Sequence, residues 1–137
     1  MINVNDLIGV PFKDGGRSKE TGFDCWGLVK EVYKRTGIDL LDFDIGCQEA
    51  SLINSAIECN RQFWEKVSNP NDHIPCLIVM RFNQAYFLNH TGVYLGGGLF
   101  IHTRERLGVN IDRVDSPAWK KLIEGYYCPK PEAYYEK

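Results

Sequence analysis

The sequence predicts an α+β fold in which N-terminal helices pack on an antiparallel β-sheet of about five strands. Helical periodicity is confined to the first half of the chain, and short apolar runs typical of strands fill the second half. A Gly96-Gly97-Gly98 turn joins two of these runs as a tight hairpin, a connection that antiparallel strands allow. Helices followed by strands favour the α+β class over alternating parallel units.

The clearest helix is expected to begin after Asp24, which is a good N-cap residue, and to end near Gly37, a suitable C-cap. We expect a short helix or turn over residues 4–10, a loop over residues 12–22 and a second helix between Gln48 and Glu65. The apolar residues of the main helix recur at helical spacing. They are Cys25, Leu28, Val29, Val32 and Tyr33.

Five strands are expected in the second half of the chain, each a run rich in β-branched or aromatic residues. They cover residues 77–82, 90–95, 99–103, 108–114 and 123–128. A length of 137 residues with 44% hydrophobic composition suits one domain over residues 1–137. The polar stretch 129–137, which contains Pro131, is expected to fray.

Composition excludes several classes of partner. The net charge of -2 provides no basic surface for nucleic acid or anionic lipid. No apolar run approaches the roughly 18 residues of a membrane span, so no membrane insertion is expected. Met1 to Asp6 lack the features of a signal peptide, so we expect synthesis and folding in the cytoplasm. The five cysteines are odd in number and without metal spacing, which favours free thiols.

Cys25 is the candidate nucleophile because it falls in the first turn of the expected helix. Unpaired N–H groups and the positive end of the helix dipole favour the thiolate there, and the same N–H groups can hold an oxyanion. The preceding Gly15, Gly16 and Gly22 allow the thiol to face a cleft. The alternative is that Cys25 is simply the first core residue of an amphipathic helix.

His90 and His102 lie on the two strands of the expected hairpin. A turn centred on Gly97 places His102 opposite Gly92, two residues from His90, so both imidazoles can project from one face. With Cys25 they match a triad of thiolate, base and orienting polar group. One alternative is a purely structural histidine pair. A zinc site is another, disfavoured because neither histidine has a second ligand nearby, so no metal or cofactor is expected.

Two stretches of the chain carry a resemblance to a known family. The first is Gly22-Phe23-Asp24-Cys25-Trp26-Gly27-Leu28-Val29, preceded by Gly9-Val10-Pro11-Phe12 and Gly15-Gly16. The second is His90-Thr91-Gly92-Val93-Tyr94-Leu95-Gly96, followed by Phe100-Ile101-His102-Thr103. They resemble the nucleophile segment and the histidine hairpin of the NlpC-type cysteine peptidases. These papain-like enzymes of bacterial cell walls cut peptidoglycan stem peptides, commonly next to D-γ-glutamate.

The resemblance implies a papain-like fold and assigns roles by position. Cys25 takes the role of nucleophile, His90 that of general base and His102 that of the third polar group. The implied reaction is acyl transfer to the thiol, followed by hydrolysis of the thioester, with no cofactor. Residues 108–114, 116–119 and 124–127 look like the branch carried by phages and prophages as a tail component. That likeness implies phage tail proteins as partners and a place in the virion.

The chain departs from the family pattern at three places, of which the third affects only a turn, and it matches the family at Asp24. The family often has Tyr where Phe12 stands, so the help of a hydroxyl at that position is missing or comes from elsewhere. It often has Ser where Trp26 stands, and a bulky ring there narrows a subsite. The strand before the base commonly starts Gly-Asp, whereas this chain has Pro75-Cys76. Asp24 matches an acidic residue of the family, and it caps the helix, contacts a substrate amine, or does both.

Two other functions remain open from the residues alone. One is a non-enzymatic tail-assembly protein that keeps the fold, which the altered Phe12 and Trp26 favour. The other is a thiol acyltransferase or hydrolase that acts on a different amide or ester, since the same thiol chemistry serves both.

Overall fold

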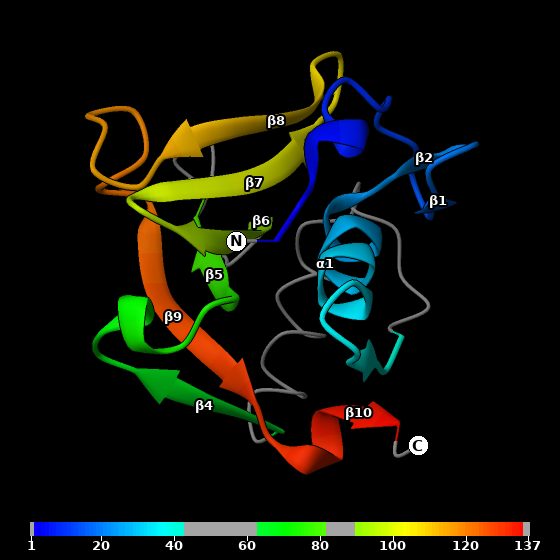
Figure 1. Ribbon diagram of the computed structural model, residues 1–137. Coiled ribbons are helices and arrows are strands. Elements are labelled where there is room, and N and C mark those ends of the chain that lie inside the picture. The colour runs from blue at the N-terminus through cyan, green and yellow to red at the C-terminus, as the bar shows by residue number, and fades with distance from the viewer. Residues whose placement is uncertain (1, 43–62, 82–89, 136–137) are drawn as a thin grey trace.

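The computed structural model describes residues 2–42, 63–81 and 90–135, and it confirms the α+β class (Figure 1). Helix α1, Cys25–Lys34, packs against a six-stranded sheet of order β4-β9-β5-β6-β7-β8 in which every neighbouring pair is antiparallel. The strands are β4 (Trp64–Val67), β5 (Cys76–Met80), β6 (His90–Gly96), β7 (Leu99–Arg104), β8 (Gly108–Arg113) and β9 (Ile123–Pro129).

Helix α1 forms where the sequence predicts it. The Asp24 side chain caps its N-terminus by accepting a hydrogen bond from the Gly27 N–H, at 2.7 Å. Lys34 lies in the last turn, and Gly37 follows with a φ of +91°, a conformation that glycine adopts without strain. Because the apolar positions repeat at helical spacing, one side of α1 is buried and holds the helix against β6 and β7.

The main sheet separates two apolar clusters because side chains alternate along each strand. The first cluster joins α1 to one face of the sheet, and the second lies on the other face. The first includes Leu28, Val29, Val32, Val79, Val93 and Ile101. The second includes Cys76, Ile78, Met80, Tyr94, Phe100 and Trp119. Cys25 is buried yet belongs to neither cluster, consistent with a place at the tip of α1.

Short elements complete the described chain. They are η1 (Asn5–Leu7), β1 (Arg17–Ser18), β2 (Gly22–Phe23), β3 (Asp39–Leu40), η3 (Pro70–Asp72), η4 (Pro131–Ala133) and β10 (Tyr134–Tyr135). Strands β1 and β2 form a small hairpin inside the stretch expected to be a loop, immediately before α1. No helix within residues 2–42, 63–81 and 90–135 is long and apolar enough to cross a membrane.

The stretch expected to fray is ordered through residue 135. Ala133 is buried in the first cluster, and its carbonyl oxygen accepts a hydrogen bond from the Leu41 N–H at 2.9 Å. Strand β10 then pairs with β3, next to the C-terminal end of α1 (Figure 1). The polar composition of the tail gave no sign of this pairing. The partner strand also lies far away in sequence, since Tyr134 pairs with Leu40.

The expected second helix lies mostly outside the described residues, but its last residues are seen and differ from the prediction. Trp64 and Glu65 belong to β4, an edge strand that adds a sixth member to the sheet. The Trp64 ring packs edge-on against Trp26 and Tyr33 of α1. At residues 64 and 65 the local periodicity predicted helix, whereas the structure has a strand whose tryptophan packs on α1.

Candidate active site

Cys25 is the first residue of α1 and is 4% exposed. The unpaired N–H groups of the first turn and the positive end of the helix dipole lie at this position. Both favour the thiolate over the thiol, and the thiolate is the reactive form of cysteine. The structure therefore confirms the position of Cys25 in the first turn of the helix, and its role as nucleophile stays a prediction.

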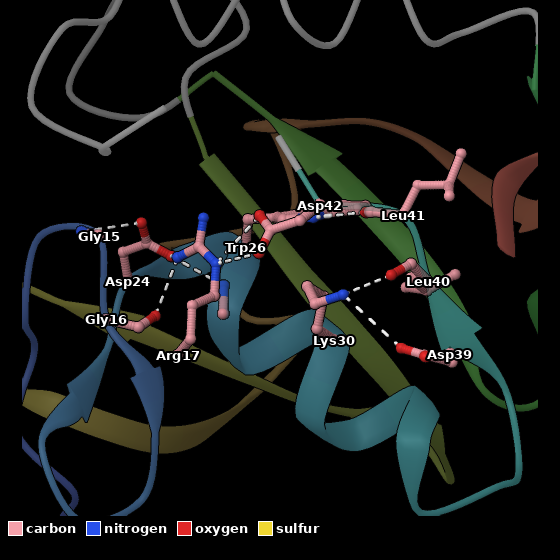
Figure 2. A network of polar contacts seen from close by, with 11 residues as sticks. Gly15, Gly16, Arg17, Asp24, Trp26, Lys30, Asp39, Leu40, Leu41 and Asp42 are labelled. Carbon is pink, nitrogen blue, oxygen red and sulfur yellow. Dashed lines mark hydrogen bonds and ion pairs between the residues drawn. The ribbon is translucent and has the colours of Figure 1, made fainter. Parts of the chain in front are cut away.

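Asp24 is fully buried, and its carboxylate is held by three protein groups (Figure 2). Oδ1 accepts from the Gly27 N–H and, at 2.6 Å, from Nη1 of Arg17, while Oδ2 accepts from the Gly15 N–H at 3.1 Å. Arg17 also bonds through Nε to Asp42. Of the two roles expected for Asp24, this geometry matches the helix cap. The carboxylate links the segment around Gly15 and Gly16, called the glycine loop below, and Arg17 of β1 to the first turn of α1.

The loop before α1 approaches the helix closely because two glycines allow it. A Cβ on Gly27 would overlap the Gly16 carbonyl oxygen and would lie 3.3 Å from Nη1 of Arg17. That carbonyl oxygen in turn accepts hydrogen bonds from the Asp24 N–H and from Arg17. The glycine loop is thus packed on the turn that carries Cys25, which fixes the environment of the thiol.

Trp26 and Phe12, both expected to lie near the substrate, differ from each other in burial and in contacts. Trp26 is 7% exposed, donates its indole N–H to the Leu41 carbonyl oxygen at 3.2 Å and packs against Trp64. These contacts hold its ring between α1 and β4, and its place in a substrate subsite stays a prediction. Phe12 is partly exposed and its backbone bridges to Phe23 of β2, so a contact of its ring with substrate stays a prediction.

The two histidines meet as the hairpin register predicted. Val93 pairs with Ile101 and Tyr94 with Phe100, a register centred on Gly97, and the register shifts by one residue next to the turn, where Gly96 pairs with Leu99. A Cβ added to Gly92 would lie 3.2 Å from the Cβ of His102, so these residues face each other across the ladder. Nε2 of His90 and Nδ1 of His102 lie 2.8 Å apart, a hydrogen bond inside the protein.

Two polar residues of β8 continue this hydrogen-bond chain, and the sequence analysis did not single them out. Nε2 of His102 lies 2.7 Å from Oδ2 of Asp112, and Nδ2 of Asn110 donates to the same oxygen at 2.8 Å. Asn110 pairs with His102 in the ladder, and Asp112 lies two residues further along the same strand face. The sequence signal for this part of the site was the pair of polar residues two positions apart on the strand that follows His102.

Trp119 and Arg104 enclose the histidine pair. The Trp119 ring stacks on His90 at a centroid distance of 6.2 Å and meets His102 edge-on at 4.6 Å. The Arg104 guanidinium lies over the Trp119 ring, 5.0 Å from its centroid. The imidazoles are thus covered by an aromatic side chain and have a fixed positive charge nearby.

Burial and these neighbours depress the basicity of both histidines. Desolvation, then His102 and then the Arg104 charge lower the pKa of His90 to about 3. Burial also lowers the pKa of His102, although the Asp112 carboxylate opposes that effect. His90 is therefore neutral at pH 7 and able to accept a proton when a negative charge forms beside it.

This lowered pKa predicts a pH-dependent stability. Between pH 6.5 and about 3 the unfolded chain binds a proton at position 90 that the folded chain does not, so stability falls as the solution is acidified. Within that window the slope from this one group approaches about 1.4 kcal/mol per pH unit. Urea unfolding at pH 7, 5 and 4 should show a smaller loss for His90→Gln than for wild type.

His73 offers the matched control for that experiment, because it lies exposed in the turn after η3. His73→Gln should follow the wild-type curve at all three pH values. An unchanged slope in His90→Gln, with the fold intact at pH 7, would show that His90 is not the group responsible.

The part of the chain that the structure describes contains no group of three His, Cys, Asp or Glu side chains arranged to hold a metal ion. The described cysteines Cys25, Cys76 and Cys128 are free thiols, as expected, and Cys47 and Cys59 lie outside the described residues. The chemistry that the described groups offer is that of a thiol at a helix tip and a buried imidazole chain ending on a carboxylate.

The NlpC/P60 family model matches residues 9–126. The chain is 31% identical over 121 residues to a gamma-DL-glutamyl hydrolase of Bacillus subtilis, a match that covers 86% of this chain and 26% of that protein. It is 27% identical over 121 residues to the peptidoglycan DL-endopeptidase CwlO of Bacillus licheniformis, covering 84% and 24% of the two chains. The chain thus spans about a quarter of the length of these relatives.

A solved structure of an NLP/P60 family protein from Staphylococcus aureus has the same fold. It superposes with a TM-score of 0.61 at 24% identity, over 91% of this chain and 38% of the other. At this identity the likeness shows the fold, and it confirms the predicted NlpC-type α+β architecture.

Proposed function

We propose a cell-wall hydrolase function from one premise: the chain belongs to the NlpC/P60 family. In this proposal Cys25 is the nucleophile, His90 the general base and His102 the group that orients His90. The substrate is the peptide stem of peptidoglycan, cut at an amide bond next to D-γ-glutamate. The similarity to a peptidoglycan DL-endopeptidase and to a gamma-DL-glutamyl hydrolase supports this choice of substrate.

The observation that carries the proposal is the 2.8 Å hydrogen bond between Nε2 of His90 and Nδ1 of His102. It engages Nε2 of His90 with His102, so in this proposal Nδ1 is the nitrogen that exchanges a proton with the reacting groups. A structural histidine pair needs no nucleophile nearby, but here the other family motif supplies a cysteine at a helix N-terminus. Together they provide a base, its support and a nucleophile.

The thiol and His90 are proposed to meet at the end of β6. His90 and His102 share a sheet face with Trp119, whereas α1 covers the opposite face. His90 is the first residue of β6 and Cys25 the first residue of α1, so contact between them passes around the strand end. Figure 1 shows α1 running beside this part of the sheet.

The reaction follows from these roles. The neutral His90 ring takes the proton of the Cys25 thiol as the sulfur attacks the amide carbonyl, and the resulting imidazolium gives its proton to the leaving amine. The Cys25 backbone N–H, at the free end of α1, contributes to binding the oxyanion. Water activated by His90 then hydrolyses the thioester and releases the acid product and the thiol.

We further propose that the protein acts at the wall as part of a phage or prophage tail, in contact with other tail proteins. The likeness of residues 108–114, 116–119 and 124–127 to the phage-borne branch supports this place of action. A phage carrying Cys25→Ala should assemble normal particles but infect poorly. Normal infection by that phage would instead favour a role in assembly alone.

The direct test of hydrolysis is digestion of purified sacculi, and of a synthetic stem peptide containing D-γ-glutamate, by wild type and Cys25→Ala. Wild type is expected to release peptide fragments with a new amine end, and Cys25→Ala to release none above background. Cys128→Ala, which removes a partly exposed thiol from β9, serves as the control and should retain activity. Equal release by wild type and Cys25→Ala would refute the proposal.

A further inference from the structure

The hydrogen-bond chain behind His90 has a definite direction because it ends on a carboxylate. An ionised carboxylate only accepts hydrogen bonds. Oδ2 of Asp112 lies 2.7 Å from Nε2 of His102 and 2.8 Å from Nδ2 of Asn110, so both nitrogens must carry hydrogen. Asp112 therefore determines which nitrogen of His102 is protonated.

The protonation of His102 then determines that of His90. Burial keeps His102 neutral, so with a hydrogen on Nε2 its Nδ1 holds a lone pair and can only accept. The group that donates to it, at 2.8 Å, is Nε2 of His90. A neutral His90 with hydrogen on Nε2 has its lone pair on Nδ1, the form required of a base for Cys25.

We infer that Asp112 is a positioning residue that sets the tautomers of both His102 and His90, and so keeps Nδ1 of His90 unprotonated and able to accept the Cys25 proton. The catalytic part of this inference rests on the proposed function, whereas the tautomer part does not. Asp112 acts through His102 and does not touch the reacting atoms.

Reversing the donor and the acceptor in the hydrogen bond between His90 and His102 shows what Asp112 prevents. If His102 carried its hydrogen on Nδ1, it would donate to Nε2 of His90, and His90 would carry its own hydrogen on Nδ1. That form cannot take a proton from the thiol. Without the carboxylate, nothing in the 2.8 Å contact between the rings favours one direction over the other.

The placement of Asp112 suits a fixed orienting group. It lies on β8 opposite Phe100, diagonal to His102 across the ladder, so the strand pairing sets its position. Its side chain is 31% exposed whereas that of His102 is fully buried, so the carboxylate stays hydrated while it holds the inner ring. Partial hydration lowers the cost of keeping this charge beside a buried imidazole.

Two substitutions at this position have opposite expected outcomes. In Asp112→Asn, both His102 and Asn110 still donate to the same site, so the new amide should place its oxygen there and preserve both tautomers. In Asp112→Ala the acceptor is lost, so His90 and His102 should each populate the tautomer with hydrogen on Nε2 and the tautomer with hydrogen on Nδ1. Asp115→Ala is the matched control, because it removes an exposed carboxylate just beyond β8 that pairs with Arg113.

The test is two-bond ¹H–¹⁵N correlation of the full-length chain with ¹⁵N-labelled histidine at pH 7. Wild type, Asp112→Asn and Asp115→Ala should show His90 and His102 protonated on Nε2 only. Asp112→Ala should show protonated Nδ1 on both rings in addition. A wild-type spectrum with protonated Nδ1 on either ring, or an Asp112→Ala spectrum identical to wild type, would overturn the inference.

Hydrolysis of the stem peptide supplies the catalytic readout. Asp112→Ala should lower kcat by roughly tenfold or more at unchanged KM, and Asp112→Asn should recover most of that loss. If wild type proves inactive on peptidoglycan, the proposed function fails while the tautomer assignment still stands on the spectra. If wild type is active and Asp112→Ala equals it, the inference fails while the proposed function stands.

Discussion

His90→Ala is expected to lower kcat/KM for a stem peptide by about 10³, because it removes the only group proposed to take the proton of the Cys25 thiol. General base catalysis contributes roughly 10² to 10⁴ in comparable sites. The substitution also leaves Nδ1 of His102 without its donor, so the remaining chain cannot replace the base. Steady-state hydrolysis of the synthetic peptide measures the effect.

His73→Ala is the control for this experiment, since it removes an exposed histidine from the turn after η3. It should keep wild-type kcat/KM. Thermal unfolding of both variants separates loss of chemistry from loss of fold. A folded His90→Ala protein within tenfold of wild-type activity would contradict the assignment of His90 as base.

Gly27→Ala is expected to destabilise the fold by roughly 3 kcal/mol. The new Cβ would overlap the Gly16 carbonyl oxygen, which is backbone and already bonded to Asp24 and Arg17. Relief of the overlap separates the glycine loop from α1, and the gain of about 1 kcal/mol in helix propensity from Ala cannot offset that cost. Urea unfolding measures the change.

Gly97→Ala provides a comparison that separates backbone strain from steric overlap. Gly97 has a φ of +61° and no atom within 4 Å of an added Cβ. The loss there should be limited to about 1 kcal/mol, the cost of a left-handed conformation for alanine. Equal stability losses at the two positions would show that the contact between Gly27 and Gly16 is not the cause.

Much of the site follows from local sequence. Asp24 before an apolar helical repeat fixes the start of α1, and with it the position of Cys25, because capping is a local interaction. The triple glycine centres the hairpin on Gly97, so the facing of His90 and His102 follows from counting along two strands. These predictions needed no knowledge of the rest of the chain.

Other features depend on contacts between distant segments, which no local pattern encodes. The pairing of β10 with β3 and the burial of Trp64 against α1 both join residues far apart in sequence. The same is true of the ion pair between Arg17 and Asp24, since a loop arginine can pair with many carboxylates. Asp112 was missed because its role depends on the register between β7 and β8.

The contact between the Cys25 sulfur and His90 is the central claim, and the rate of Cys25 alkylation by iodoacetamide across pH tests it most directly. Peptide mass spectrometry can follow Cys25 separately from the other thiols. At pH 6, well below the pKa of about 8.5 of an ordinary thiol, wild-type Cys25 should react much faster than Cys25 in His90→Ala, and the two rates should converge above that pKa. Superimposed pH–rate curves for the two proteins would contradict the account.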